Sequence, residues 1–580
     1  MDRSGPGRSH IAGTTSPREL EKLLYNSHVL LCSPKMDVRI CAGLAFAESL
    51  LINWLNKTSQ RPVLSTTHFG ISVLALLGLQ WILLKIYRVF VYPHFFSPLR
   101  NLPGPKDGHF LVGQMLNQYR ASSPVQGFLD WSVQWPDEPL IKYFGLANNE
   151  MLLINTVEAH KQILQAHCYD FIKPEFIHRS VGEIVGTGLL LAEKQEHKRQ
   201  RRLVLNVFSV PNIKKLLPVF QEEARLMVKS IKQKLQEEPT GDIDVLSIFS
   251  KAALNSIGLA AMGIKLENLK DPETGMDCQQ CYRRMLSQST MSALISFINV
   301  HLPIRWAIPL EANLGYVRAM HGLRSMISRY IDQRSREIAQ GDKEKEVGFE
   351  SRDLLTYMLE ERESTGEILT TDQIMGHLQN FLAAGHETTA GTLTWATYVL
   401  ATRPDIQDKL RSEIKTLTEG TPDYASIERL HYLNNFFREV TRLYSTAPFT
   451  YREADSDIVI CGRFVPKGTH LVMSPFVSNL STQIWGENAR EFRLERWDSL
   501  TGDAATPYGI ETFSNGPRVC IGKMYAVLLF KAFIVQMLQD FRFSKSADLV
   551  ARGGKFPEIQ NPGVTYRPKG DIKIHVERLH

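Results

Sequence analysis

The chain has 580 residues, of which 43% are hydrophobic and 22% charged, with a formal net charge of +6. This length requires at least one large domain plus an additional segment, and the composition is that of a globular protein. The small charge and the lack of zinc-finger, RNA-binding or basic-zipper patterns exclude nucleic acid as a partner, and seven scattered cysteines exclude a disulfide scaffold and favour a reducing compartment.

The first hundred residues contain two apolar stretches. Residues 1–35 are polar and rich in Gly, Ser and Arg, which predicts disorder. The stretch 40–55 is short for a membrane span and is broken by Glu48, so a second span, an interfacial helix and a buried helix all remain open. We assign residues 1–68 to a polar N-terminal extension that contains this apolar stretch. The stretch 69–92 approaches the length that a bilayer requires, and basic residues follow it, so we expect one transmembrane anchor there, with the rest of the chain in the cytosol.

A proline-rich segment, residues 93–106, follows the expected anchor. Closely spaced prolines fix φ and remove hydrogen-bond donors, which predicts a stiff, extended spacer. Before the anchor, Asn56-Lys57-Thr58 is a glycosylation triplet on the expected lumenal side. Such triplets are common, and whether Asn56 carries a glycan stays open.

The remaining residues, 107–580, are predicted to form one catalytic domain. Short strand-like runs occur at 140–144 and 151–154, and long helical patterns dominate from about 200 to 450. This order predicts an α+β fold, mainly α, with a small sheet on the N-terminal side.

A strongly basic stretch, Lys194 to Arg202, contains His197 and Arg201. It is either a solvated helix face or a docking patch for an acidic electron-transfer partner, whose encounter complementary charge would speed.

Cys278 and Cys281 have the spacing of a redox or metal-binding pair. No second pair, histidine pair or thioredoxin-like βαβ pattern completes such a site. We interpret them as two incidental thiols on a helix.

A long helical pattern from about Thr371 to Thr402 contains Gly385, Glu387 and Thr388 in an otherwise apolar setting. These residues are locally unfavourable there, and such conflicts are typical of functional sites. A threonine can bond the i−4 carbonyl and open a groove for a small molecule, and a neighbouring carboxylate can relay protons. A solvated helix face is the alternative.

Two charged segments follow. Glu439 and Arg442 are at i, i+3 on one predicted helix face, a pairing that is common in proteins. Arg452 comes ten residues after Arg442, and Arg496 lies in the segment Phe492–Trp497.

The stretch Phe513–Gly522 holds a lone cysteine, Cys520, between two glycines and Arg518, directly before an apolar helical run. Glycine permits positive φ and close backbone approach, and a helix N-terminus favours a negatively charged sulfur. Arg518 can neutralise an anionic ligand group. The pattern therefore predicts a thiolate presented to a metal; a capping turn with a buried structural cysteine is the alternative.

In this order the motifs resemble those of the cytochrome P450 family, and the resemblance covers nearly all of the chain after the anchor. The spacing Phe-x-x-Gly-x-Arg-x-Cys-x-Gly of residues 513–522 resembles the haem-ligating loop, and residues 383–389 resemble the oxygen-activation helix. The segment 97–105 looks like the proline-rich hinge of membrane-bound members. The resemblance implies the P450 fold, with Cys520 as the ligand of the haem iron.

The resemblance also implies roles for the other motif residues. Glu387 and Thr388 would be the acid–alcohol pair. Glu439, Arg442 and Arg496 would form a buried charge triad, although Leu494 stands where the family usually has proline. The implied haem-binding residues are Phe513, Gly516, Arg518, Cys520, Gly522, Arg452, Arg201 and His197, the last in place of the usual tryptophan.

The implied activity is that of a haem-thiolate monooxygenase carrying heme b. It inserts one oxygen atom from O2 into a hydrophobic small molecule, with electrons from NADPH delivered by NADPH–cytochrome P450 reductase and with cytochrome b5 as a further candidate partner. The implied location is the endoplasmic reticulum membrane, with the catalytic domain cytosolic. Substrate contacts are expected from residues 275–315, 383–388 and 447–450.

The Gly-His-Glu-Thr-Thr form at 385–389 is shared by fatty-acid and alkane hydroxylases and by many fungal enzymes of secondary-metabolite biosynthesis, and the latter is the favoured setting. Alternatives are a fatty-acid, alkane or xenobiotic hydroxylase and a P450-fold isomerase or dehydratase. A non-enzymatic haem binder and a metal-free membrane protein with a structural Cys520 also stay open.

Overall fold

The computed structural model describes residues 34–59, 66–286, 289–340, 353–364, 369–417, 421–553, 556–561, 565–570 and 572–579. Nearly all of the stretch 1–35, for which disorder is predicted, lies outside these residues. The chain divides into two compact units, Met1–Arg100 with Ala147–Asn149, and Asn101–Leu146 with Glu150–His580. We call them the N-terminal unit and the catalytic unit and describe each by itself.

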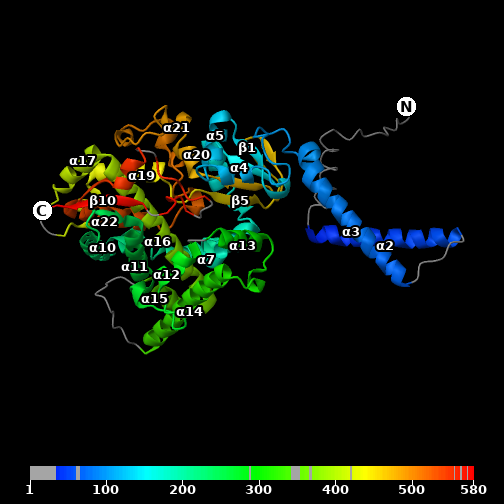
Figure 1. Ribbon diagram of the computed structural model, residues 1–580, viewed down its shortest axis with the longest axis horizontal. Helices are drawn as coiled ribbons and strands as arrows, with labels where there is room; N and C mark the ends of the chain where they lie inside the picture. The colour runs from blue at the N-terminus through cyan, green and yellow to red at the C-terminus, as the bar shows by residue number, and fades with distance from the viewer. Residues whose placement is uncertain are drawn as a thin grey trace, which may run out of the picture. The chain divides into compact units, whose positions relative to one another are not determined.

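The N-terminal unit contains two long helices, α2 (Pro34–Thr58) and α3 (Thr66–Ile86), which pack against each other (Figure 1). Both are long and apolar enough to cross a membrane. The apolar stretch at 40–55, whose structure the sequence left open, is thus part of a helix paired with the expected anchor.

A π-helix, η1 (Tyr87–Phe96), continues α3 and contains Pro93. The Ser97 N–H donates to the Tyr92 carbonyl at 2.9 Å, the i→i+5 pattern of a π-turn. Helical structure therefore runs to Phe96, into the range 93–106 for which an extended spacer is predicted. The sequence rule overstates the effect of Pro93, because a single proline near a helix end removes only one donor.

The main sheet of the catalytic unit has five strands in the order β1-β2-β8-β5-β3. The β2–β8 pair is parallel and the other pairs are antiparallel. Both predicted strands are confirmed, but the sheet is not confined to the N-terminal side, since two strands come from residues 450–473. The strands are β1 (Leu140–Phe144), β2 (Glu150–Ile154), β3 (Phe171–Ile172), β5 (Thr450–Ala454) and β8 (His470–Met473).

Two smaller sheets complete the strand structure. A three-stranded sheet brings the C-terminal end of the chain against residues near 243, and a two-stranded hairpin lies at about 458–465. Their strands are β4 (Asp242–Asp244), β9 (Phe541–Lys545) and β10 (Lys573–Arg578), and β6 (Ile458–Ile460) and β7 (Arg463–Val465).

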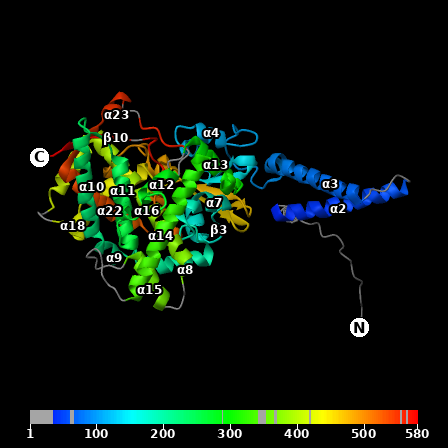
Figure 2. The same cartoon turned by 60° about the horizontal axis from the view of Figure 1, so that its bottom comes forward.

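Helices form most of the catalytic unit (Figure 2). The shorter ones, up to thirteen residues, are α4 (Met115–Arg120), α5 (Gln126–Gln134), α6 (Val157–Lys161), α7 (Glu175–Val185), α8 (Lys194–Leu205), α9 (Val210–Lys215), α12 (Cys278–Leu286), α13 (Thr290–His301), α15 (Leu354–Ser364), α17 (Pro404–Ile414), α18 (Tyr424–Glu428), α19 (His431–Leu443), α20 (Pro475–Asn479), α21 (Thr482–Trp485) and α23 (Ala547–Ala551). The longer ones are α10 (Leu217–Glu237), α11 (Val245–Met262), α14 (Glu311–Ala339), α16 (Thr371–Thr402) and α22 (Lys523–Asp540).

The central helix is α16, whose predicted bounds are confirmed. Thr370 and Gln373 form a reciprocal capping box at its start, which satisfies two otherwise unpaired N–H groups. It packs against α11, α14, α19 and α22 (Figures 1 and 2). Although α11 is apolar enough to cross a membrane, its residues are mostly buried in this core. The core thus fixes the helix that carries Glu387 and Thr388.

Candidate functional site

The cysteine loop is held by its own backbone. The Cys520 N–H donates to the Phe513 carbonyl at 2.8 Å, and the Val519 N–H donates to the Gly516 carbonyl at 3.0 Å, within a short 3-10 turn, η9 (Gly516–Arg518). Helix α22 begins at Lys523, three residues after the cysteine. These bonds fix Cys520 just before a helix N-terminus, as the sequence predicts.

The two glycines of the loop have different functions. Gly516 has φ +68, and a Cβ there would lie 2.1 Å from the Leu164 carbonyl oxygen, so no other residue fits without a backbone shift. Gly522 has φ −83, which any residue can adopt. A Cβ at Gly522 would instead lie 3.9 Å from Cys520 Sγ. Positive φ is therefore needed at only one of the two glycines.

Cys520 is exposed to solvent, although many protein atoms lie close to its sulfur. Burial raises the pKa of the thiol, whereas the Gly522 N–H, Arg201 and Lys523 all lower it. A sulfur that is both accessible and next to donors and cations can be held as a thiolate by a metal.

A cluster of cations lies near this loop, which we call the cationic cluster: Lys173, Arg201, Arg452 and Arg518. Within the described residues, Glu193 is the carboxylate that pairs with it. Arg518 forms an ion pair with Glu193 and donates to the Ala192 carbonyl at 2.9 Å, while its Nε is buried without a hydrogen-bond partner. Lys173 Nζ lies 3.2 Å from Glu193. Four cations against one carboxylate leave an excess of positive charge.

Burial, followed by the neighbouring cations, lowers several pKa values in and beside this cluster. Burial, with Arg452 and Arg518 nearby, lowers the pKa of Lys173 to about 7. Burial and Arg518 lower the pKa of Arg452 to about 10. His197 is buried beside the same cations, which with burial lower its pKa to about 3, and its Nδ1 lies 3.2 Å from the Tyr169 hydroxyl. An anionic group bound here would relieve the repulsion.

Glu387 and Thr388 are neighbours on α16 but bond to different partners. Thr388 Oγ1 donates to the Ala384 carbonyl at 2.6 Å, the predicted i−4 contact. Glu387 Oε1 accepts from Arg567 Nη1 at 2.9 Å and from Thr565 Oγ1 at 3.0 Å. Within the described part of the chain no hydrogen bond joins Glu387 to Thr388.

Glu387 lines a cavity of about 170 Å³. Its wall comes from the start of α11, from α12 and α16, and from the segment after α23, and includes Asp244, Arg283, Gln560 and Arg567. Arg567 is itself held by Gln560, whose Oε1 accepts from Arg567 Nε at 2.8 Å. The carboxylate is thus held at the wall of this cavity.

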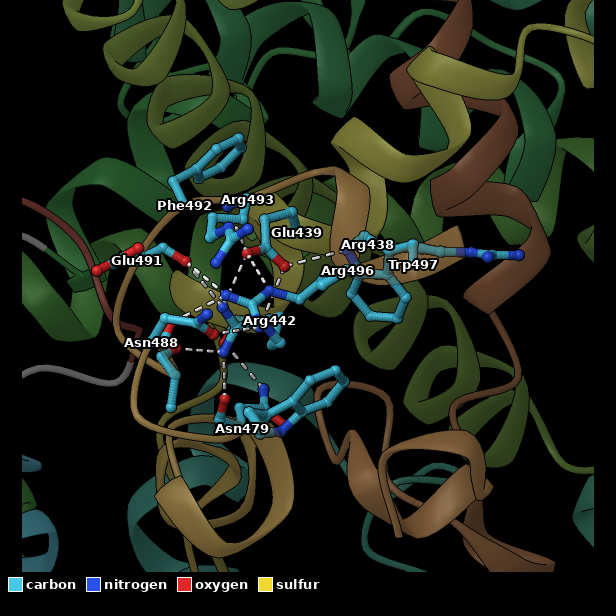
Figure 3. Close-up of polar contacts among 12 residues, drawn as sticks. Arg438, Glu439, Arg442, Asn479, Asn488, Glu491, Phe492, Arg493, Arg496 and Trp497 are labelled. Atoms are coloured by element: carbon cyan, nitrogen blue, oxygen red, sulfur yellow. Dashed lines mark hydrogen bonds and ion pairs between the residues drawn. The ribbon is translucent and has the colours of Figure 1, made fainter. Parts of the chain in front are cut away.

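The structure brings Glu439, Arg442 and Arg496 together (Figure 3). Arg442 Nη2 and Nε lie 2.8 and 2.9 Å from the Glu439 oxygens, and Arg496 Nε lies 2.9 Å from Oε1. Glu439 and Arg442 are fully buried. The carboxylate also accepts from the Arg493 N–H at 2.9 Å and from Trp497 Nε1 at 3.0 Å. This network joins α19 to the segment 488–497.

Sequence reasoning missed several of these partners. Lys173 of the cationic cluster, its partner Glu193, and Arg567 beside Glu387 belong to no sequence motif. Trp497, beside Glu439, lies in a motif but has no role assigned from the sequence. Only Trp497 carried a usable signal, because it lies within the Phe492–Trp497 segment. The others reach the site only through the tertiary fold, because their partners lie far away in the sequence: Arg567 is 180 residues from Glu387, and Glu193 is 325 residues from Arg518.

Cys278 and Cys281 lie on α12, and both are fully buried. Burial raises the pKa of both thiols, that of Cys281 to about 12. Among the described residues no group of three or more His, Cys, Asp or Glu side chains could hold a metal ion. Buried, protonated thiols support the interpretation of this pair as incidental.

Comparisons with known proteins give one result. The family model described as "Cytochrome P450" matches residues 103–569. The curated cytochrome P450 monooxygenase sphH of Aspergillus fumigatus is 31% identical, covering 84% of this chain and 90% of its own length. Cytochrome P450 monooxygenase ALT8 of Alternaria alternata is 28% identical, covering 93% of this chain and 99% of its own length. Cytochrome P450 monooxygenase FUM15 of Gibberella moniliformis is 30% identical, covering 85% of this chain and 91% of its own length.

Proposed function

The chain belongs to the cytochrome P450 family, and from this premise we propose that it is a haem b-dependent enzyme that oxidises a hydrophobic small molecule. Its enzyme class is that of the P450 monooxygenases, oxidoreductases that incorporate oxygen from O2. The observation that carries the residue assignments is the accessible Cys520 beside a cationic cluster that has one carboxylate partner.

The residues present fit a haem. Cys520 would be the iron ligand, in the loop that Phe513, Gly516 and Gly522 shape. The cationic cluster, with its buried Arg518 Nε that lacks a partner, fits the two propionate groups. Arg518, Arg452, Arg201 and His197 are the proposed propionate partners. When bound, the haem supplies the iron that activates O2 under thiolate ligation.

The chain itself supplies position and protons. The Thr388 hydroxyl is held on α16 by its hydrogen bond to the Ala384 carbonyl. The Glu387 carboxylate, bonded to Arg567 and Thr565 at the cavity wall, can accept a proton at Oε1 or Oε2 and pass it on towards Thr388 Oγ1. The Glu439 network keeps α19 and the segment 488–497 fixed. We assign Glu387 and Thr388 as the acid–alcohol pair and Glu439, Arg442 and Arg496 as the structural triad.

The substrate is proposed to be hydrophobic and to belong to secondary-metabolite biosynthesis. The expected contact region 275–315 forms α12, α13 and the start of α14, and it exposes several large apolar side chains, among them Met291, Leu294 and Trp306. The Gly-His-Glu-Thr-Thr form at 385–389 supports the metabolic assignment.

The proposed electron donor is NADPH–cytochrome P450 reductase, with cytochrome b5 as a second partner, at the endoplasmic reticulum membrane. The basic helix α8 is the proposed docking element, but two of its five Lys and Arg side chains are already in ion pairs, and Arg201 belongs to the cationic cluster. Lys194 forms an ion pair with Asp455, and Arg199 pairs with Glu196 at 2.8 Å. The exposed Arg202 and Lys198 are the cations that remain for a partner.

The deciding experiment is the absorption spectrum of the reduced, CO-treated protein in membranes. The proposal expects the red-shifted band of thiolate-ligated haem and its loss in Cys520→Ala. A missing band, or a band that survives the substitution, would overturn the assignment. Untargeted product profiling with the reductase, comparing the active enzyme with Cys520→Ala, then identifies the substrate.

A further inference from the structure

Polar contacts join the two apolar helices of the N-terminal unit. Gln80 Nε2 donates to Glu48 Oε2 at 2.8 Å, and Ser72 Oγ donates to Ser49 Oγ at 3.0 Å. The rings of Phe46 and Phe69 also meet edge to face, 5.8 Å between centroids. Helix α2 therefore has a specific partner in α3.

Small, buried residues line the face of α2 that contacts α3, which allows the two helices to approach closely. Cys41, Ala45 and Ser49, spaced by four residues, have exposed fractions of 5%, 0% and 0%. On α3 the polar residues Ser72 and Gln80 are spaced by eight and so lie on one face. Small residues at a crossing point and hydrogen bonds between helices are what hold helix pairs together in lipid.

The outward faces of both helices are apolar. On α2 and α3 many large hydrophobic side chains are exposed, including Leu44, Phe46, Leu50, Leu51, Trp54, Ile71, Leu74, Leu79, Ile82 and Leu83. Water would not stabilise such a surface around a two-helix unit. Helices of 25 and 21 residues are about 37 and 31 Å long, enough to cross a hydrocarbon core of roughly 30 Å.

Glu48 lies near the middle of the apolar stretch 40–55 and is the residue that argued against a span. In hydrocarbon an acidic side chain is tolerated when a polar partner meets it. Gln80 is that partner, and its Oε1 is buried without a hydrogen bond.

We propose that α2 and α3 cross the membrane together as a hairpin, which puts the N-terminus on the same side as the catalytic unit. The inference rests on the proposed membrane attachment. Basic residues agree with it: Lys22, Lys35 and Arg39 come before the apolar stretch 40–55, Lys57 and Arg61 come between the two apolar stretches, and Lys85, Arg88 and Arg100 come after residue 84. A single span at 69–92 puts the N-terminus on the opposite side.

Topology is tested on the full chain in sealed microsomes with an epitope tag at each end. If the two helices form a hairpin, protease should remove both tags without detergent. Removal of the C-terminal tag with protection of the N-terminal tag would overturn the hairpin and leave the single anchor standing. Release of the whole chain by carbonate would instead overturn the membrane attachment on which it rests. The reduced-CO spectrum, read in parallel, reports the proposed catalytic function separately.

The pairing is tested by oxidative cross-linking in the same membranes. In a chain with Cys32 and Cys41 replaced by Ala, the double variant Ser49→Cys/Ser72→Cys is expected to form a disulfide, detected by mass spectrometry. The matched control is Leu50→Cys/Ser72→Cys, because Leu50 is 49% exposed and faces outward. Strong cross-linking of the first pair over the control supports the hairpin; equal yields, or none from the first pair, would overturn it.

Discussion

Glu387 shows how far a motif residue depends on residues outside its motif. Its carboxylate is held by Arg567 and Thr565, which come from the last sixteen residues of the chain. Arg567 in turn is fixed by Gln560 and by the Leu286 carbonyl at 3.3 Å. Arg567 is therefore a positioning residue for the proposed proton relay.

Replacing Arg567 with Met is expected to reduce the product formed per NADPH consumed by about tenfold, because a displaced carboxylate delivers protons poorly. Arg567→Lys should restore most of the coupling, since the ion pair can re-form. Coupling is measured together with the solvent deuterium isotope effect, which a merely structural loss would not change. Unaltered coupling in Arg567→Met would remove Arg567 from the relay.

His377 gives a pH prediction. It is fully buried on α16 with both ring nitrogens unbonded, and burial, aided by Arg199, lowers its pKa to about 4. The unfolded chain binds its proton near pH 6.5, so between these values the folded state holds fewer protons and stability falls as pH falls. The loss through His377 between pH 7 and pH 5 is about 2 kcal/mol.

The variant His377→Leu should remove that part of the acid sensitivity. Denaturant unfolding at several pH values checks it, with His431→Leu, an exposed histidine paired with Asp498, as the control. The same slope in His377→Leu and in the parent would contradict the prediction.

Among the elements, the cysteine loop and the Glu439 network carry the most specific geometry. The helix Thr371–Thr402 could be predicted with its bounds because a capping box starts it and Arg403-Pro404 ends it. The strands β5 and β8 could not, since four or five residues between helices leave too little periodicity. The cationic cluster was predicted only in part, because Lys173 and Glu193 reach it through the tertiary fold.

Gly516→Ala is expected to destabilise the protein by more than about 2 kcal/mol and to lower haem incorporation, because it forces positive φ on an L-residue and a clash with Leu164. Gly522→Ala is the matched control, with an ordinary φ and no backbone contact below 3.4 Å. Denaturant unfolding and the haem-to-protein ratio measure both. Equal stability of the two variants would show that the backbone of the loop adapts.

Arg442→Met should cost about 3–5 kcal/mol, because it leaves the Glu439 carboxylate buried beside fewer donors. The control is Asp405→Ala, which breaks the exposed Arg403–Asp405 pair at 2.8 Å and should cost less than about 1 kcal/mol. Unfolding midpoints compare the two. Similar costs would mean that the network contributes no more than a surface ion pair.

For the whole molecule, the division into two units predicts separable functions. The catalytic unit has its own core around α16, while α2 and α3 expose apolar faces. The family model also begins only at residue 103.

Deleting residues 1–100 should therefore keep the reduced-CO spectrum and the melting temperature, because few of the core contacts are lost. The deleted form should leave the carbonate-resistant membrane fraction that the full chain occupies. Immunoblots of the fractions and thermal melts check this. A form without the spectrum would show that the N-terminal unit is needed for folding.

The contacts of Glu387 also bear on the order in which the enzyme becomes competent during synthesis. Cys520 and its loop leave the ribosome before Thr565 and Arg567, which come more than 40 residues later in the sequence. A nascent or C-terminally clipped chain can complete the cysteine loop while the carboxylate on α16 still lacks its anchor. Such a chain would hold the proposed iron ligand without the fixed carboxylate of the proposed proton relay.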